Sequence, residues 1–262
     1  MDLMTVLGAS TGIGVVVYVL SIGGMTKYLL NPEAFILIFG GTLGSVMISY
    51  PWSVLRFVPG AFKMMVIPPR RPPPMLLIRT FVHLAEKARK EGLDSLAVDV
   101  QQAPHPFLAD GLQMIIDGLD TETIRERFER DILVTRHRHG QTSSIFKSAG
   151  TFAPIFGLLG TLVGVVQVLS KIKDPNQMAS SMAIAMTASF YGIFSANFLF
   201  LPIANKLTFY SDEEVLSREL IAKGLLALQA GEAPWLIAKK LEAYLSFHMR
   251  RSGVRHYKAF VE

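Results

Sequence analysis

Four long blocks of apolar residues, separated by charged and proline-rich stretches, dominate the pattern along the chain. The first runs from Leu3 to Ile22 and the second from Ala34 to Tyr50, and neither contains a charged residue. Two further uncharged blocks run from Phe152 to Leu169 and from Met178 to Leu201. A helix of about 20 apolar residues crosses a hydrocarbon core of roughly 30 Å. The pattern therefore predicts four transmembrane helices.

Short connections pair these spans into two membrane hairpins. The first hairpin comprises residues 1–50 and is closed by Pro51 and Trp52, a helix breaker beside an aromatic residue typical of the membrane interface. The second hairpin comprises residues 149–204. Because Asp2 stands where a secretory signal has basic residues, we interpret the first span as a retained helix.

The other two segments are polar and helical in pattern. Residues 51–148 begin with the semi-amphipathic stretch WSVLRFVPGAFKMMVI and the linker PPRRPPP, whose fixed φ angles favour an extended chain. We expect a helical cytoplasmic domain there and further cytoplasmic helices in residues 205–262. Thr121 is the expected N-cap of one of these helices. The fold class is thus an all-α membrane protein, with helices predicted over Met75–Lys90, Pro106–Asp117 and Thr121–His139.

Composition and charge place the chain in a membrane and orient it there. Half of its 262 residues are hydrophobic and only 18% are charged, with a mean hydropathy of +0.37. Of the 26 lysine and arginine residues, 23 lie in residues 51–148 and 206–262. Because basic residues concentrate on the cytoplasmic side, we expect a multi-pass protein of the bacterial inner membrane with both termini in the cytoplasm. This topology explains the net charge of +5, so no nucleic-acid partner is expected.

Several kinds of chemistry are excluded. The chain has no cysteine, and it contains no phosphate-binding loop, dinucleotide fingerprint or nucleophile elbow. His137 and His139, two residues apart on a predicted helix, point to different sides and are a poor metal pair. We therefore expect no enzyme, no metal site and no cofactor.

The spans carry no ionisable side chain in their interiors. An ion-translocating protein usually needs such a group at depth, so any ion path requires a carboxylate from another subunit. Thr161, Thr187 and Ser189 either bond to their own helices or line such a path. Pro154 and Pro202 either end or kink their helices, or form a pair of hinges.

Two segments, TFAPIFGLLGTLVGVVQVL and MAIAMTASFYGIFSANFLFLPIANKL, resemble spans three and four of the MotA/PomA flagellar stator subunits. AEKARKEGLDSL, PFLADGLQMIIDGLD and GEAPWLIAKKLEAYL extend the resemblance over essentially the whole chain. It implies a homopentamer around two copies of a MotB-type partner, whose single span carries the ion-binding aspartate. The implied function is conversion of H⁺ or Na⁺ flow into torque on the rotor protein FliG. A TolQ/ExbB-like energiser of an envelope process is the alternative, but those subunits lack the first hairpin.

The resemblance also implies roles for single residues. Pro154 and Pro202 match prolines that couple ion binding to movement, and Thr161 matches a threonine that faces the partner's aspartate. Ser189 stands where a second threonine is usual. Ala188 favours H⁺ over Na⁺, because sodium-driven members tend to carry threonine there. With Thr187, these side chains are the predicted lining of the ion pathway.

The resemblance further implies a contact with the rotor. Arg89, followed by Lys90, matches a cytoplasmic arginine that engages FliG. Ala97 stands where the family has a glutamate, so Asp94 or Asp99, on what we expect to be the same helix, would supply the acidic contact. The alternative is that these charges are merely solvated.

Overall fold

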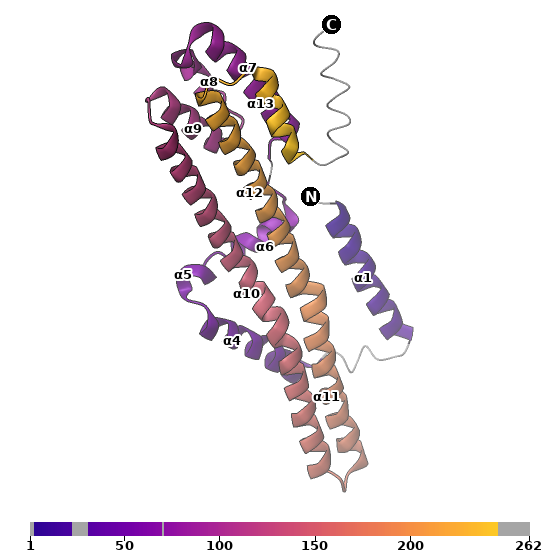
Figure 1. Cartoon of the computed structure of the whole chain (residues 1–262). Coiled ribbons are helices and arrows are strands. Elements are labelled where there is room, and N and C mark those ends of the chain that lie inside the picture. Colours follow the sequence, from indigo (N-terminus) through magenta and orange to yellow (C-terminus); the bar gives the residue numbers. More distant parts are fainter. Residues whose placement is uncertain (1–2, 23–30, 70, 246–262) are drawn as a thin grey trace. The chain divides into compact units, whose positions relative to one another are not determined.

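The computed structural model describes residues 3–22, 31–69 and 71–245, and every regular element in these ranges is helical (Figure 1). Contacts between residues divide the chain into two compact units. Unit 1 comprises Met1–Pro69 and Arg138–Tyr210, and unit 2 comprises Arg70–His137 and Ser211–Glu262. Each unit is therefore built from two separate stretches of sequence.

Unit 1 contains the apolar helices. α1 spans Leu3–Ile22. The second hydrophobic block is one continuous helical segment made of α3 (Pro32–Phe35), the π-helical turn η1 (Ile36–Gly40) and α4 (Gly41–Ser49). Asn31 caps its start by accepting a hydrogen bond from the amide of Ala34 at 3.1 Å. Within the described residues, four helices are long and apolar enough to cross a membrane, as predicted.

Two long helices run through both units. α10 spans Thr121–Ser170 without interruption, so the predicted helix before residue 139 and the third span are one helix. The chain returns through α11 (Pro175–Ser195), the π-helical turn η3 (Ala196–Phe200) and α12 (Leu201–Gln229). Asp174 caps α11 through the amide of Asn176 at 3.1 Å.

The cap of α10 corrects one prediction. Asp120, not Thr121, accepts the amide of Thr123 at 3.0 Å. Its carboxylate also accepts the Thr123 hydroxyl, and these hydrogen bonds hold the pKa of Asp120 below its ordinary value. The carboxylate suits the positive end of the helix dipole better than a hydroxyl does.

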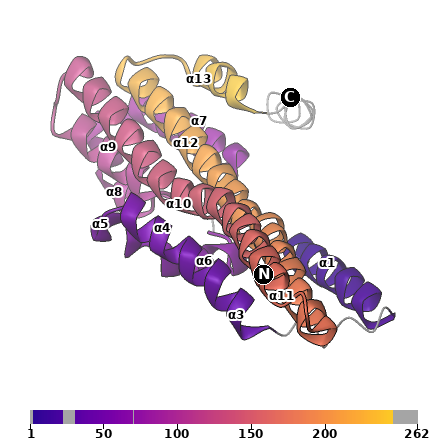
Figure 2. The same cartoon turned by 90° about the horizontal axis from the view of Figure 1, so that it is seen from below.

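Two short helices follow the second span in unit 1. α5 spans Trp52–Leu55 and α6 spans Val58–Val66. Figure 2 shows α4 and α5 on one side of α10. Side chains of α6 pack against α10 and α12 in a cluster formed by Ala61, Phe146, Ile203, Ala204 and Leu207.

Unit 2 is a helical domain around a continuous apolar core. It contains α7 (Pro74–Glu91), the 3₁₀ turn η2 (Leu93–Leu96), α8 (Ala97–Gln101) and α9 (Pro106–Ile116). α13 (Pro234–Leu241) packs against α7 and is followed by η4 (Glu242–Tyr244). The start of α10 and the end of α12 complete this domain, whose core includes Phe81, Leu84, Leu108, Phe128 and Leu225.

Candidate functional site

α10 and α11 approach each other along a line of small residues. A side chain at Gly160 would overlap Ala188, and one at Gly164 would overlap Ala185. Gly192 is the tightest backbone approach, because an added Cβ would lie 2.6 Å from the carbonyl oxygen of Ala153. Small residues permit this spacing, as the pattern in the two spans predicted.

The four predicted pathway residues lie at one level of this helix pair. The Thr161 hydroxyl is half-buried and donates to the carbonyl of Leu158 at 2.6 Å. The Ser189 hydroxyl reaches from α11 to the carbonyl of Gly157 on α10, at the long distance of 3.5 Å. Thr187 and Ala188 are buried, Ala188 with an exposure of only 1%. Ala188 therefore packs inside the chain, while Thr161 and Ser189 remain partly accessible.

Neither predicted coupling proline ends its helix. Pro154 lies inside α10, and Pro202 is the second residue of α12. Because proline has no amide hydrogen, each leaves the carbonyl four residues earlier, at Gly150 and Phe198, without its usual donor. The π-helical turn η3 ends two residues before Pro202 and contains Phe198. Such turns interrupt the regular hydrogen-bond ladder and often mark functional positions.

The predicted rotor-contact residues separate into an exposed set and a paired residue. Arg89 and Lys90 are exposed in the last turn of α7, and Asp94 is exposed in η2. Asp99 instead forms an ion pair with Lys87, with 2.7 Å between the carboxylate oxygen and Nζ, and its side chain is only 20% exposed. Its charge is therefore already used within the domain.

The expectation that Asp94 and Asp99 share a helix with Arg89 is wrong. α7 ends at Glu91, and Gly92 adopts φ +86°, a positive value that glycine accepts without strain. Asp94 follows in η2 and Asp99 in α8. The i, i+4 spacing argument therefore does not apply across this turn.

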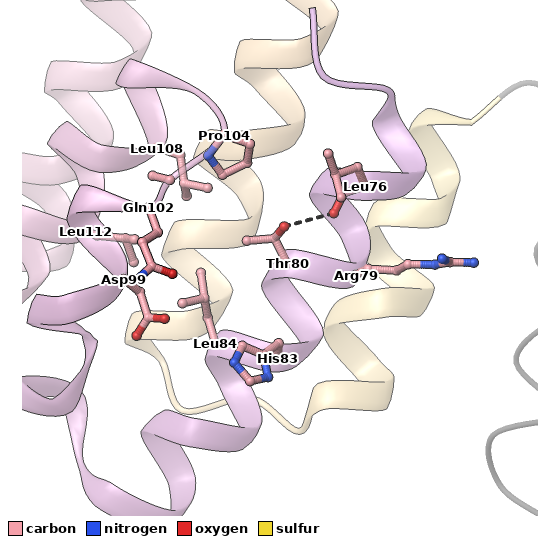
Figure 3. A pocket seen from close by; sticks show the side chains of 11 residues that line it. Leu76, Arg79, Thr80, His83, Leu84, Asp99, Gln102, Pro104, Leu108 and Leu112 are labelled. Atoms are coloured by element: carbon pink, nitrogen blue, oxygen red, sulfur yellow. Dashed lines mark hydrogen bonds between the residues drawn. The ribbon is translucent and has the colours of Figure 1, made fainter.

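Sequence reasoning missed a cavity of about 510 Å³ between α7, α8 and α9 (Figure 3). Leu84, Leu108 and Leu112 line its apolar part, and His83 and Asp99 lie among its polar residues. The cavity depends on the turn at Gly92, which brings α8 back beside α7. No periodic pattern in the sequence indicates it. In the described residues, no group of three or more histidines and carboxylates could hold a metal ion.

A half-buried ion-pair network in unit 2 was also missed. Glu214 pairs with Arg71 at 3.2 Å and with Arg218 at 2.9 Å. Arg218 also donates to the Thr135 hydroxyl at 2.9 Å and lies over the ring of Phe107. The network ties the linker before α7 to α10 and α12. Glu214 and Arg218 are only four residues apart, but Arg71 and Thr135 are far from them in sequence, so spacing alone could not find the whole network.

His105 lies beside this network and caps α9. Its Nδ1 accepts the amide of Phe107 at 3.1 Å. Burial is the main cause that lowers the pKa of His105 below 6.5, and the charge of Arg218 lowers the pKa further. The neutral imidazole is therefore the folded form, as an accepting Nδ1 requires.

We expect the stability of unit 2 to fall as pH drops below about 6.5. Below that pH the unfolded chain binds a proton at His105 more readily than the folded chain does. The contribution of His105 to the free energy of unfolding, which is present above about pH 6.5, is therefore lost as pH falls through the pKa of the folded form. His105→Asn keeps a capping acceptor without titrating. Thermal unfolding of the purified protein between pH 7.5 and 5 should show a smaller loss in this variant. An identical loss in both proteins would contradict the role of His105.

Comparisons with known proteins agree with this architecture along nearly the whole chain. Residues 99–220 match the model of the MotA/TolQ/ExbB proton channel family. Chemotaxis protein PomA of Vibrio alginolyticus is 32% identical, covering 94% of this chain and 96% of that protein. Motility protein A of Bacillus subtilis is 34% identical, covering 83% and 80%. The solved flagellar MotAB stator complex from Bacillus subtilis contains a chain with a TM-score of 0.86 and 31% identity, covering 96% and 98%. The predicted all-α membrane fold is confirmed.

Proposed function

The chain belongs to the MotA/PomA family of flagellar stator subunits, and from that premise we propose that it forms an ion channel with a MotB-type partner and drives the rotor. Proteins of this family are channel and motor subunits, so the chain is not an enzyme. One observation carries the proposal. The apolar stretches of four helices in the described residues contain no Asp, Glu, Lys, Arg or His. A partner must then supply the ion-binding carboxylate.

The ion pathway of the proposal runs beside Thr161 and Ser189. Both side chains are half-buried, so a partner helix can approach them. Thr187 and Ala188, which are buried, shape the wall from behind. The transported ion is H⁺ in this proposal and no cofactor is required. The alanine at position 188 supports this choice, because Na⁺ needs several oxygen ligands whereas a proton needs only the carboxylate.

The proposed function is tested by swimming. A stator-deleted bacterium should swim when it expresses this chain with its MotB-type partner, and its speed should not change when external sodium is varied at constant proton-motive force. Replacement of the partner's aspartate by asparagine is the matched negative control. Strict dependence on sodium would overturn the H⁺ assignment. Absence of swimming, with an assembled complex in the membrane, would contradict the motor role and favour a TolQ-like energiser.

The path from ion to rotor in the proposal passes through the two long helices. α10 and α12 each extend continuously from the apolar region into unit 2, which supports direct transmission of a change near Pro154 or Pro202. Arg89, Lys90 and Asp94 then contact FliG. We assign the acidic contact to Asp94 because the carboxylate of Asp99 already pairs with Lys87.

The chain is a multi-pass membrane protein. The concentration of lysine and arginine in residues 51–148 and 206–262 supports an inner-membrane location with both termini in the cytoplasm. The proposed assembly is five copies of this chain around two copies of the partner. The resemblance to a chain of a solved MotAB complex, over 96% of the present sequence, supports assembly with a MotB-type partner.

A further inference from the structure

The segment directly after the second span, residues 52–67, has two apolar sides. It contains α5 and α6, and it begins three residues after α4 ends at Ser49. Because a chain extends at most about 3.6 Å per residue, Trp52 lies within roughly 11 Å of the end of the span. The segment therefore begins at the edge of the membrane.

One side of the segment is covered by the protein. Ala61 of α6 is 2% exposed and belongs to the cluster with Phe146 of α10 and Ile203 of α12. Val58 and Met65 pack on the same cluster, at the spacing of one helix face. These contacts join the segment to the two long helices at the end of their apolar stretches.

The opposite side is exposed and rich in aromatic residues. Trp52 is 76% exposed and Phe57 is 43% exposed. Phe62 does not belong to this side, because its ring packs edge-to-face on Phe146 of α10. Ile67, at the end of the segment, is exposed as well. Aromatic side chains, tryptophan above all, are favoured at the boundary between hydrocarbon and water. Both sides of the segment are thus apolar, and the exposed side has the composition that is favoured at the bilayer interface.

The charge of the segment is entirely positive. Arg56 and Lys63 are exposed, and the Arg56 guanidinium lies 4.9 Å from the centre of the Phe57 ring. The sequence contains no aspartate or glutamate between Glu33 and Glu86. Glu33 itself lies at the start of α3, at the far end of the second span. The two cations therefore have no carboxylate of their own stretch to pair with.

We propose that residues 52–67 bind anionic phospholipid headgroups. Arg56 and Lys63 contact the phosphates, and Trp52 and Phe57 lie at the level where the acyl chains begin. Basic residues next to a span attract anionic lipid over a distance set by the ionic strength. This inference goes beyond the proposed motor role and does not depend on it, because its test measures lipid contact and not swimming.

Trp52 serves as the probe of lipid contact. The chain has two tryptophans, Trp52 and Trp235. The complex is reconstituted with Trp235→Phe into vesicles of equal parts phosphatidylglycerol and phosphatidylcholine, with only one of the two lipids brominated. The fluorescence of Trp52 is obtained by subtracting the fluorescence of a sample that also carries Trp52→Phe. This subtraction removes any contribution of tryptophans in the partner. Stronger quenching by brominated phosphatidylglycerol, by about threefold, is expected.

Two charge-matched double variants decide the outcome. Arg56→Gln with Lys63→Gln should reduce the ratio of quenching by the two lipids to about one, because both cations are removed. Lys171→Gln with Lys173→Gln removes two exposed lysines from the turn between α10 and α11 and should leave the ratio unchanged. Raising the salt concentration should lower the ratio in the parent protein, which tests the proposal even if a variant does not assemble. The proposal would be overturned by a quenching ratio of one in the parent protein, by an equal fall of this ratio in both double variants, or by no quenching with either brominated lipid.

Discussion

Replacement of Gly192 by leucine is expected to abolish swimming by separating α10 from α11. A Cβ atom at this position would lie 2.6 Å from the carbonyl oxygen of Ala153, 3.0 Å from Cα of Gly157 and 3.2 Å from Cα of Pro154. All three neighbours are backbone atoms, so no side-chain rotation relieves the overlap. Overpacking of a close interface typically costs about 1–3 kcal/mol. The cost of placing a leucine side chain at a glycine contact should lie at the upper end of this range or above it.

The measurement is the melting temperature of the detergent-purified complex, together with swimming speed. Gly44→Leu is the matched control, because a Cβ on Gly44 of α4 meets no atom within 4 Å in this chain. The Gly192 variant should melt at a lower temperature and fail to swim, whereas the control should stay close to the parent on both counts. Normal stability and motility of the Gly192 variant would show that the two helices are not packed this closely.

The membrane elements could be predicted from the sequence because hydrophobicity alone decides them. Uncharged runs fixed the four spans, and Asp174–Pro175 signals the start of α11 through a capping carboxylate and a proline at the first position. The continuity of α10 was not predictable in this way. Before about residue 150 the apolar residues of α10 lie on one face of the helix, and after it they cover the whole circumference. Such a change looks like the boundary between two helices, although the helix continues.

The candidate site was predicted in its composition but not in the contacts between its helices. Thr161 and Ser189 were chosen as hydroxyl groups at depth. The Thr161 hydroxyl bonds to Leu158 of its own helix, which was one of the two expected alternatives, whereas the contact of Ser189 with the carbonyl of Gly157 on α10 depends on helix packing. The pairing of Asp99 with Lys87 depends on the turn at Gly92, whose φ of +86° redirects the chain after α7. Networks such as Arg71–Glu214–Arg218 join residues more than 140 positions apart and require the tertiary fold. Local patterns contain no information on these contacts.

Replacement of Pro202 by alanine is expected to make the complex more resistant to heat while it stops the motor. Alanine restores the amide hydrogen that the carbonyl of Phe198 lacks, and proline inside a helix costs about 3 kcal/mol. The π-helical turn η3, which ends at Phe200, should then be replaced by regular α-helix. If bending at this point transmits ion binding to unit 2, a straighter and more stable helix transmits less.

This opposite change of stability and function separates a hinge from a merely structural residue. Pro175→Ala is the matched control, because Pro175 is the first residue of α11, where its amide hydrogen would have no partner within the helix. That variant should change neither the melting temperature nor swimming by much. Both properties should be measured on the complex with its partner, with membrane content checked by immunoblotting. A Pro202→Ala complex that swims normally would rule out the hinge, and one that is both immotile and less stable would show that Pro202 supports packing instead.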